Sequence, residues 1–289
     1  MAMISEINDN EIRVIGGDGN VGGDGDKRRI PWWVWVVVGV AVVAIAMLAI
    51  HHKPRPEEAI TPSPDTSAVT KASGIWYNNA DANMPSATLV TDTLIDTLHL
   101  HIFTPYNATP ELHVGRLDTN DADIILAAMA ADIRRDNGKI VGAFVLAGEP
   151  LSWGLSKKGY CAIIDERITI GVAENSPLFE QATEQGGYFF RQYAAVDNGA
   201  TVMNNPENAA FRRALCVLNG KICIVTCTDR VLMNDFSASL VKLGVSEAIF
   251  LVGGTADGWY RTADGKMEQF GSSYAKNTKY MNHIVFRKQ

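Results

Sequence analysis

The sequence has no surplus of basic residues, no metal-type cysteine pair and no internal repeat. Its 26 Lys and Arg residues are outnumbered by 32 Asp and Glu residues, which gives a formal net charge of −6. A nucleic-acid partner requires a basic face, so this balance argues against one. The four cysteines form no C-x-x-C pair. The sequence therefore predicts no metal site and identifies no cofactor.

Long apolar runs are also scarce, with one exception at residues 30–50. That stretch holds no charged residue, and at about 1.5 Å per residue it is long enough to cross a hydrocarbon core of about 30 Å. Lys27, Arg28 and Arg29 precede it and favour a cytoplasmic N-terminus. A cleaved signal peptide is the alternative, but the segment before the run is too long and no clear cleavage site follows. We expect a single-pass membrane anchor with a periplasmic or extracellular domain.

Composition divides the rest of the chain into three parts. Residues 1–29 are rich in Gly, Asp and Asn, which predicts a disordered cytoplasmic tail because too little apolar surface is available to order it. Residues 51–74 place several prolines among polar residues and indicate a semi-extended linker. From residue 75 to residue 289 the pattern changes to short strands and a few helices. We therefore expect one globular domain over residues 75–289.

The periodicity of this domain predicts more strands than helices. A cap-like start, recurring apolar residues and a terminal Asn-Gly predict a first helix over residues 119–137. A second helix is expected over residues 235–243, ended by Gly244. Because the strands do not alternate strictly with helices, we predict an α+β fold with a mixed or antiparallel sheet, preceded by the transmembrane helix. The expected strands span residues 94–103, 140–146, 160–164, 167–172, 213–218, 221–226 and 248–252.

The strongest local signal is a hairpin around Asn219 and Gly220. Asn-Gly is the preferred pair for a two-residue type I′ turn. Counting back from that turn places Cys216 opposite Cys223, at a spacing that allows a disulfide. Buried free thiols are equally compatible with the pattern. The sequence leaves both alternatives open.

The order of motifs around this hairpin resembles the phosphodiester glycosidase family. The resemblance rests on RRALC at 212–216, NGKICIVT at 219–226 and LVKLGVSEAIFLVGG at 240–254. Upstream, VGAFV at 141–145 resembles the family's N-G-G-F-F strand. Two departures stand out: Val252 replaces the aspartate of the family's D-G-G motif, and no asparagine precedes Phe144 at the matching position.

The resemblance implies a site that holds a sugar-phosphate diester. Arg213 matches the family's arginine and would pair with the anion, with Gly253, Gly254 and Thr255 as the ligand-binding loop. From the residues themselves, Asp257 is a candidate to replace the missing carboxylate. Glu149, in the turn after the strand at 140–146, is the second catalytic candidate.

Two functions from different classes follow from these features. The first is a membrane-anchored hydrolase that cleaves a sugar-phosphate diester or related glycoside outside the cytoplasm. The second is a catalytically silent domain that binds envelope glycan or phosphoglycan. The retained arginine favours the first, and the missing D-G-G aspartate favours the second. In both cases the expected partners are the membrane and a carbohydrate ligand, with no nucleic acid.

Overall fold

The computed structural model describes residues 75–253, 256–271 and 279–289. Strands dominate this part of the chain, and every strand pair in it is antiparallel. The only helices among the described residues are α2 (Leu178–Glu184) and α3 (Met233–Leu243). The predicted α+β class is therefore wrong, because the domain is built from antiparallel β-sheets.

The predictions for the first 74 residues concern a part of the chain that the structure does not describe. The disordered tail at 1–29, the transmembrane helix at 30–50 and the linker at 51–74 all lie outside the described residues. Within the described ranges, neither helix has the length and apolar character needed to cross a bilayer.

The largest sheet is seven-stranded and carries the predicted hairpin at its centre. Its order is β1-β2-β13-β12-β14-β10-β11. In that order the strands are Thr88–Ile95, Leu98–Pro105, Lys221–Cys227, Arg213–Leu218, Val245–Phe250, Ala194–Asp197 and Ala200–Thr201. The pairing of β2 with β13 joins the first hairpin of the domain to strands from much later in the chain.

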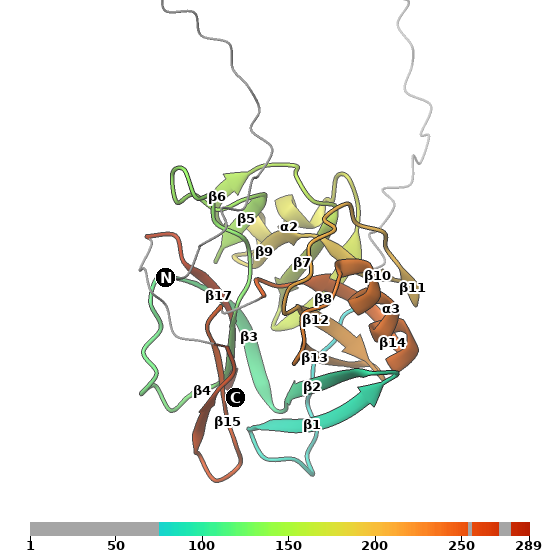
Figure 1. Ribbon diagram of the computed structural model, residues 1–289. Coiled ribbons are helices and arrows are strands. Elements are labelled where there is room, and N and C mark those ends of the chain that lie inside the picture. The colour runs from blue at the N-terminus through green and yellow to red at the C-terminus, as the bar shows by residue number, and fades with distance from the viewer. Residues whose placement is uncertain (1–74, 254–255, 272–278) are drawn as a thin grey trace, which may run out of the picture. The chain divides into compact units, whose positions relative to one another are not determined.

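Two five-stranded sheets complete the domain (Figure 1). One has the order β16-β15-β4-β17-β3, with strands Met267–Gln269, Gly258–Arg261, Ile124–Met129, Asn282–Lys288 and Ala108–Val114. The other has the order β6-β5-β9-β7-β8, with strands Glu149–Trp153, Ala143–Leu146, Tyr188–Gln192, Gly159–Ile164 and Arg167–Val172.

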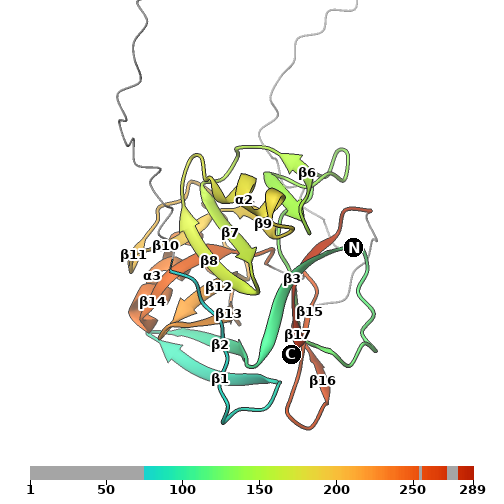
Figure 2. The same cartoon turned by 180° about the vertical axis from the view of Figure 1, so that it is seen from behind.

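The main core forms where the three sheets meet. It includes Leu215 from the seven-stranded sheet, Ile284 from the sheet of β17, and Phe144 and Phe190 from the sheet of β5. Alternate residues of the same strands point the other way, as the two-residue period of a strand requires. On that opposite side, α3 packs on the seven-stranded sheet and α2 packs on the sheet of β5. Figures 1 and 2 show the two helices on separate parts of the domain.

The hairpin and the second helix form as predicted. β12 and β13 pair across Asn219 and Gly220, with Cys216 opposite Cys223. Both cysteines are buried free thiols in the layer beneath α3, so they act there as small apolar side chains. α3 ends at Gly244, which adopts a left-handed conformation with φ 95°.

Two other element predictions are wrong. The helix expected over residues 119–137 is replaced by the strand β4, all six residues of which are buried. Its side chains reach the main core on one face and the layer of Trp259 on the other, so a continuous apolar run was mistaken for a helical stripe. The single strand expected over residues 94–103 is a hairpin, with a turn at Asp96 (φ 55°).

Candidate functional site

Four neighbouring strands align a row of polar side chains on one face of the large sheet. Asp92 lies directly opposite His101, His101 opposite Thr226, and Thr226 opposite Arg213. Directly opposed residues of antiparallel strands point to the same face. The row therefore brings a carboxylate, an imidazole, a hydroxyl and a guanidinium together. His101 Nδ1 is hydrogen-bonded to the Asp92 carboxylate.

Arg213 is the most enclosed member of this row, with 3% of its surface exposed. Its Nη1 donates to the carbonyls of Val252 at 3.4 Å and Asp257 at 3.1 Å, and its Nη2 donates to the carbonyl of Ala256 at 3.2 Å. The guanidinium carbon also lies 4.6 Å from the centre of the Phe270 ring. Arg213 thus holds the loop that follows β14 and stacks on an aromatic face.

Gly253 allows this loop to approach β12 closely. A Cβ at this position would lie 2.5 Å from the carbonyl oxygen of Phe211, which is closer than carbon and oxygen atoms can approach. The absence of a side chain therefore serves backbone packing between the loop and the segment leading into β12.

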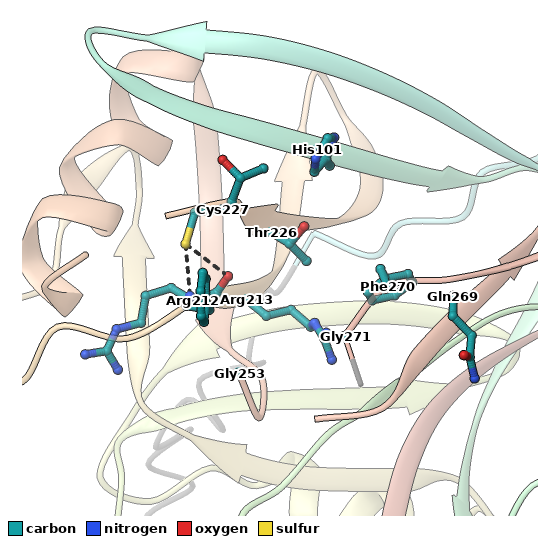
Figure 3. Close-up of a pocket in the computed structure, with 11 residues that line it drawn as sticks. His101, Arg212, Arg213, Thr226, Cys227, Gly253, Gln269, Phe270 and Gly271 are labelled. Carbon is teal, nitrogen blue, oxygen red and sulfur yellow. Dashed lines mark hydrogen bonds between the residues drawn. The ribbon is translucent and has the colours of Figure 1, made fainter. Parts of the chain in front are cut away.

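A cavity of about 480 Å³ opens beside the polar row. His101, Thr226 and Arg213 line it, together with Gly253 and Phe270. Figure 3 shows Arg213 extending from β12 toward Phe270, with His101 and Thr226 on the adjacent strands. The lining combines an apolar ring with hydrogen-bonding groups, as small-molecule sites do.

Arg212 extends in the opposite direction (Figure 3). Its backbone N–H donates to Cys227 Sγ at 2.9 Å, and its Nε donates to the carbonyl of Val231 at 3.1 Å. Burial raises the pKa of the Cys227 thiol, so the thiol is no activated nucleophile although it lines the cavity.

A second cavity of about 470 Å³ adjoins the first. The two share Phe211, Arg212, Arg213 and Gly253 in their walls. The second also has charged and amide groups of its own, including those of Asp132, Arg135, Gln192 and Asn208. Together the cavities are lined by Arg212, Arg213 and, in the second cavity, Arg135 and the carboxylate of Asp132.

Comparisons with known proteins agree with this architecture. No family model matches the chain, and no curated protein matches it in sequence. Among solved structures, the chain is similar to the catalytic domain of zebrafish N-acetylglucosamine-1-phosphodiester α-N-acetylglucosaminidase, auto-inhibited by a pro-peptide. The TM-score is 0.53 and the sequence identity is 11%, and the match covers 75% of this chain and 87% of that chain.

A hypothetical protein from Synechocystis also aligns, with a TM-score of 0.49 and 15% identity over 70% of this chain and 62% of that chain. At identities this low, the likeness to the zebrafish domain shows the fold alone. The described domain has a phosphodiester glycosidase-like fold.

This fold brings three of the predicted site residues together. Arg213 contacts the loop that contains Gly253 and Asp257. Glu149 is instead an exposed residue at the start of the edge strand β6, and it lines neither cavity. Gly254 and Thr255 lie outside the described residues.

Asp257 has the electrostatics of a partly enclosed carboxyl. Burial raises the pKa of Asp257 above its usual value, while the Gly258 N–H and the charges of Arg213 and Arg116 act in the opposite direction. Desolvation therefore outweighs two nearby cations. Like Glu149, Asp257 lines neither cavity, so its raised pKa describes a partly buried carboxyl in the loop beside Arg213.

Sequence reasoning missed three groups that the phosphodiester glycosidase-like fold gathers at the cavities. His101, Thr226 and Asp132 are not among the site residues predicted from the sequence. The hairpin register alone was sufficient to place Thr226 opposite Arg213. His101 and Asp132 required long-range strand pairing, for which one sequence contains no signal. Within the described ranges, no three His, Cys, Asp or Glu side chains gather as a metal site.

Proposed function

We propose that this domain is a phosphodiester glycosidase-like hydrolase that cleaves a sugar-phosphate diester, held outside the cytoplasm by residues 30–50. The observation that supports it best is the buried Arg213 against the loop after β14, at a cavity of about 480 Å³, in a fold similar to that of the zebrafish enzyme. That enzyme's name describes action on an N-acetylglucosamine-1-phosphodiester. We take the same ligand class as the first substrate to test.

The chemistry of such a diester matches the groups at the cavity walls. Breaking the bond between the sugar carbon and the phosphate oxygen leaves negative charge on the phosphate. Guanidinium groups stabilise that charge best, because they donate two hydrogen bonds in one plane. Arg212 and Arg213 line both cavities and supply such groups. Asp257 lies in the loop whose carbonyls Arg213 holds; it lines neither cavity and is the candidate proton donor by its place beside Arg213.

The test is hydrolysis of an N-acetylglucosamine-1-phosphodiester, and of an aryl glycoside, by the full chain. We expect turnover by the wild type and a loss of at least about tenfold in Arg213→Lys, because an ammonium cannot reproduce the planar contacts of the guanidinium. Arg134→Lys is the matched control, since Arg134 is exposed and its side chain hydrogen-bonds to Asp136 within the part of the chain that the structure describes.

A different result would support the binding-only alternative. If the folded wild type releases no sugar from either substrate but binds N-acetylglucosamine-1-phosphate in calorimetry, the hydrolase proposal is wrong. The domain would then be a glycan or phosphoglycan receptor, consistent with Val252 in place of the family's aspartate.

A further inference from the structure

A buried lysine stands behind the second cavity. Lys157 lies between β6 and β7 in a left-handed conformation, φ 71°, which few residues other than glycine adopt. Its side chain is only 7% exposed and is ion-paired with Asp132. Its Nζ also donates to Gln192 Oε1 at 2.6 Å and lies 4.8 Å from the centre of the Tyr193 ring. Strained backbone conformations of this kind are found at functional sites, and Lys157 adopts one within the group formed with Asp132, Gln192 and Tyr193.

The surroundings hold the Lys157 backbone in place. The buried Arg191 donates from Nη1 to the carbonyl of Lys157 at 3.0 Å and to that of Ala173 at 2.8 Å, and from Nη2 to that of Glu174 at 3.0 Å. A left-handed non-glycine residue is strained, and it persists only where its surroundings fix it. Arg191 supplies that constraint on the Lys157 backbone.

Asp132 is held equally firmly, from other elements. The buried Asn282 side chain accepts from the N–H of Ala131 at 2.7 Å and donates to its carbonyl at 3.0 Å. The Val141 N–H donates to the carbonyl of Asp132 at 2.8 Å. The Asp132 backbone is thus fixed on both sides, just beyond the end of β4.

The Asp132–Lys157 pair is asymmetric. The lysine is enclosed, whereas the Asp132 side chain is 41% exposed and lines the second cavity. Burial lowers the pKa of Lys157, and the charge and hydrogen bond of Asp132 oppose that change. In this half-buried ion pair, the enclosed lysine fixes the orientation of the more exposed carboxylate. Here the group presented to the cavity is a carboxylate.

We propose that Asp132 is the catalytic base of the second cavity and that Lys157 is its positioning residue, an inference that rests on the proposed hydrolysis. Asp132 removes a proton from water as the water oxygen bonds to the anomeric carbon. The bond from that carbon to the phosphate oxygen breaks, and its electron pair leaves with the phosphate. The products are the free sugar and a phosphomonoester, and Asp132 returns its proton to solvent.

Arginines line the same cavity as Asp132. Arg212 and Arg213 belong to both cavities, and Arg135 lines the second together with Asp132. The cleavage requires both a base for the water and positive charge for the leaving phosphate, and this lining contains both residue types.

The first test is Asp132→Asn in the full chain, assayed on the N-acetylglucosamine-1-phosphodiester. Asparagine keeps an oxygen that can accept from Lys157 but cannot act as a base. We expect kcat to fall by about 10²–10⁴-fold with little change in KM. Asp136→Asn is the matched control, because Asp136 is an exposed carboxylate four positions along the same segment; it should keep wild-type kcat.

Two further variants separate catalysis from folding. In Asp132→Ala, sodium azide should restore turnover, because azide attacks the anomeric carbon without a base and a purely structural defect gains nothing from it. Lys157→Met should lower kcat on its own but have no further effect in the Asp132→Asn background, since Lys157 acts only through Asp132. Circular dichroism of each variant checks that it is folded.

Each outcome has one meaning. Loss of kcat in a folded Asp132→Asn, with azide rescue of Asp132→Ala, supports the proposal. If the alanine variant does not fold, the asparagine variant and the double variant still decide. An active wild type with an equally active Asp132→Asn overturns the role of Asp132 and leaves the proposed function standing. A folded wild type that releases no sugar from either the diester or the aryl glycoside overturns both.

Discussion

At the scale of single residues, buried charged groups at the site are satisfied by backbone as much as by opposite charge. Arg213 caps the carbonyls of Val252, Ala256 and Asp257, so its first role is to shape the loop. The sequence suggested that Arg213 pairs with an anion, and it did not predict that Arg213 binds these carbonyls. The carbonyls belong to residues 39 to 44 positions away in the chain, so the contact depends on the tertiary structure.

The partly enclosed Asp257 predicts a pH-dependent stability. Because the folded pKa of Asp257 is raised, its contribution to stability is fully present below the unfolded value of 3.8 and is lost as pH rises through the folded pKa. The Asp257→Asn variant has no titrating carboxyl at this position, so it does not lose stability in this way as pH rises. Its free energy of unfolding in urea, relative to wild type, should therefore increase as pH rises from about 3 and then level off.

Asp136 provides a control of opposite sign. The hydrogen bond from Arg134 lowers the pKa of Asp136, so its contribution is present above the unfolded value and is lost as pH falls. Asp136→Asn should lose stability relative to wild type as pH rises, by a small amount because the pair is exposed. A flat difference for Asp257→Asn over the same range would show that burial does not govern this carboxyl.

At the scale of elements, local signals predicted turns and caps well and the burial of strands poorly. The Asn-Gly turn and the glycine that ends α3 depend on backbone conformations of the residues themselves. β4 depends on having apolar layers on both of its faces. In the sequence alone, a run of six apolar residues fits either a buried helix or a buried strand. Pairing with the neighbouring strands β15 and β17 determines that it is a strand.

The contact between the loop after β14 and β12 predicts a strict requirement for Gly253. In Gly253→Ala the new methyl group would meet the carbonyl of Phe211 at 2.5 Å and displace the loop that Arg213 holds. We expect a loss of about 1–3 kcal/mol in the free energy of unfolding, measured in urea, together with reduced turnover.

Gly154→Ala is the comparison for that variant. Its added carbon would lie 3.3 Å from the Gly142 Cα, a contact that a shift of a few tenths of an ångström relieves. It should cost less stability than Gly253→Ala and leave turnover near that of wild type. Equal losses in the two variants would argue against a special role for the loop.

At the scale of the whole molecule, the site is assembled where separate sheets and loops converge. One cavity lies against the row from β1 to β12, and the other adds residues from the end of β4 and from β9. Glu149 shows that a residue near a site strand in the sequence can lie away from the site in the fold. It is close to the Phe144 strand in the chain, yet the fold places it on an outer edge.

The location of the protein remains a prediction from residues 30–50. We expect the full chain to sediment with membranes and to resist extraction at high salt, because burial of about 20 apolar residues in lipid is insensitive to ionic strength. A variant lacking residues 30–50 should move to the soluble fraction. Recovery of the full chain in the soluble fraction would contradict the anchor.

The sequence by itself determined the features that depend on neighbouring residues: the Asn219–Gly220 hairpin with its register, the end of α3 at Gly244, and the motif order that resembles phosphodiester glycosidases. Backbone preference and the two-residue period of strands suffice for these. Tertiary structure alone decided that β4 is a strand, that His101 faces Thr226, and that Lys157 meets Asp132 from 25 positions away. Such pairings arise from the burial of surfaces distant in the chain, which no local pattern records.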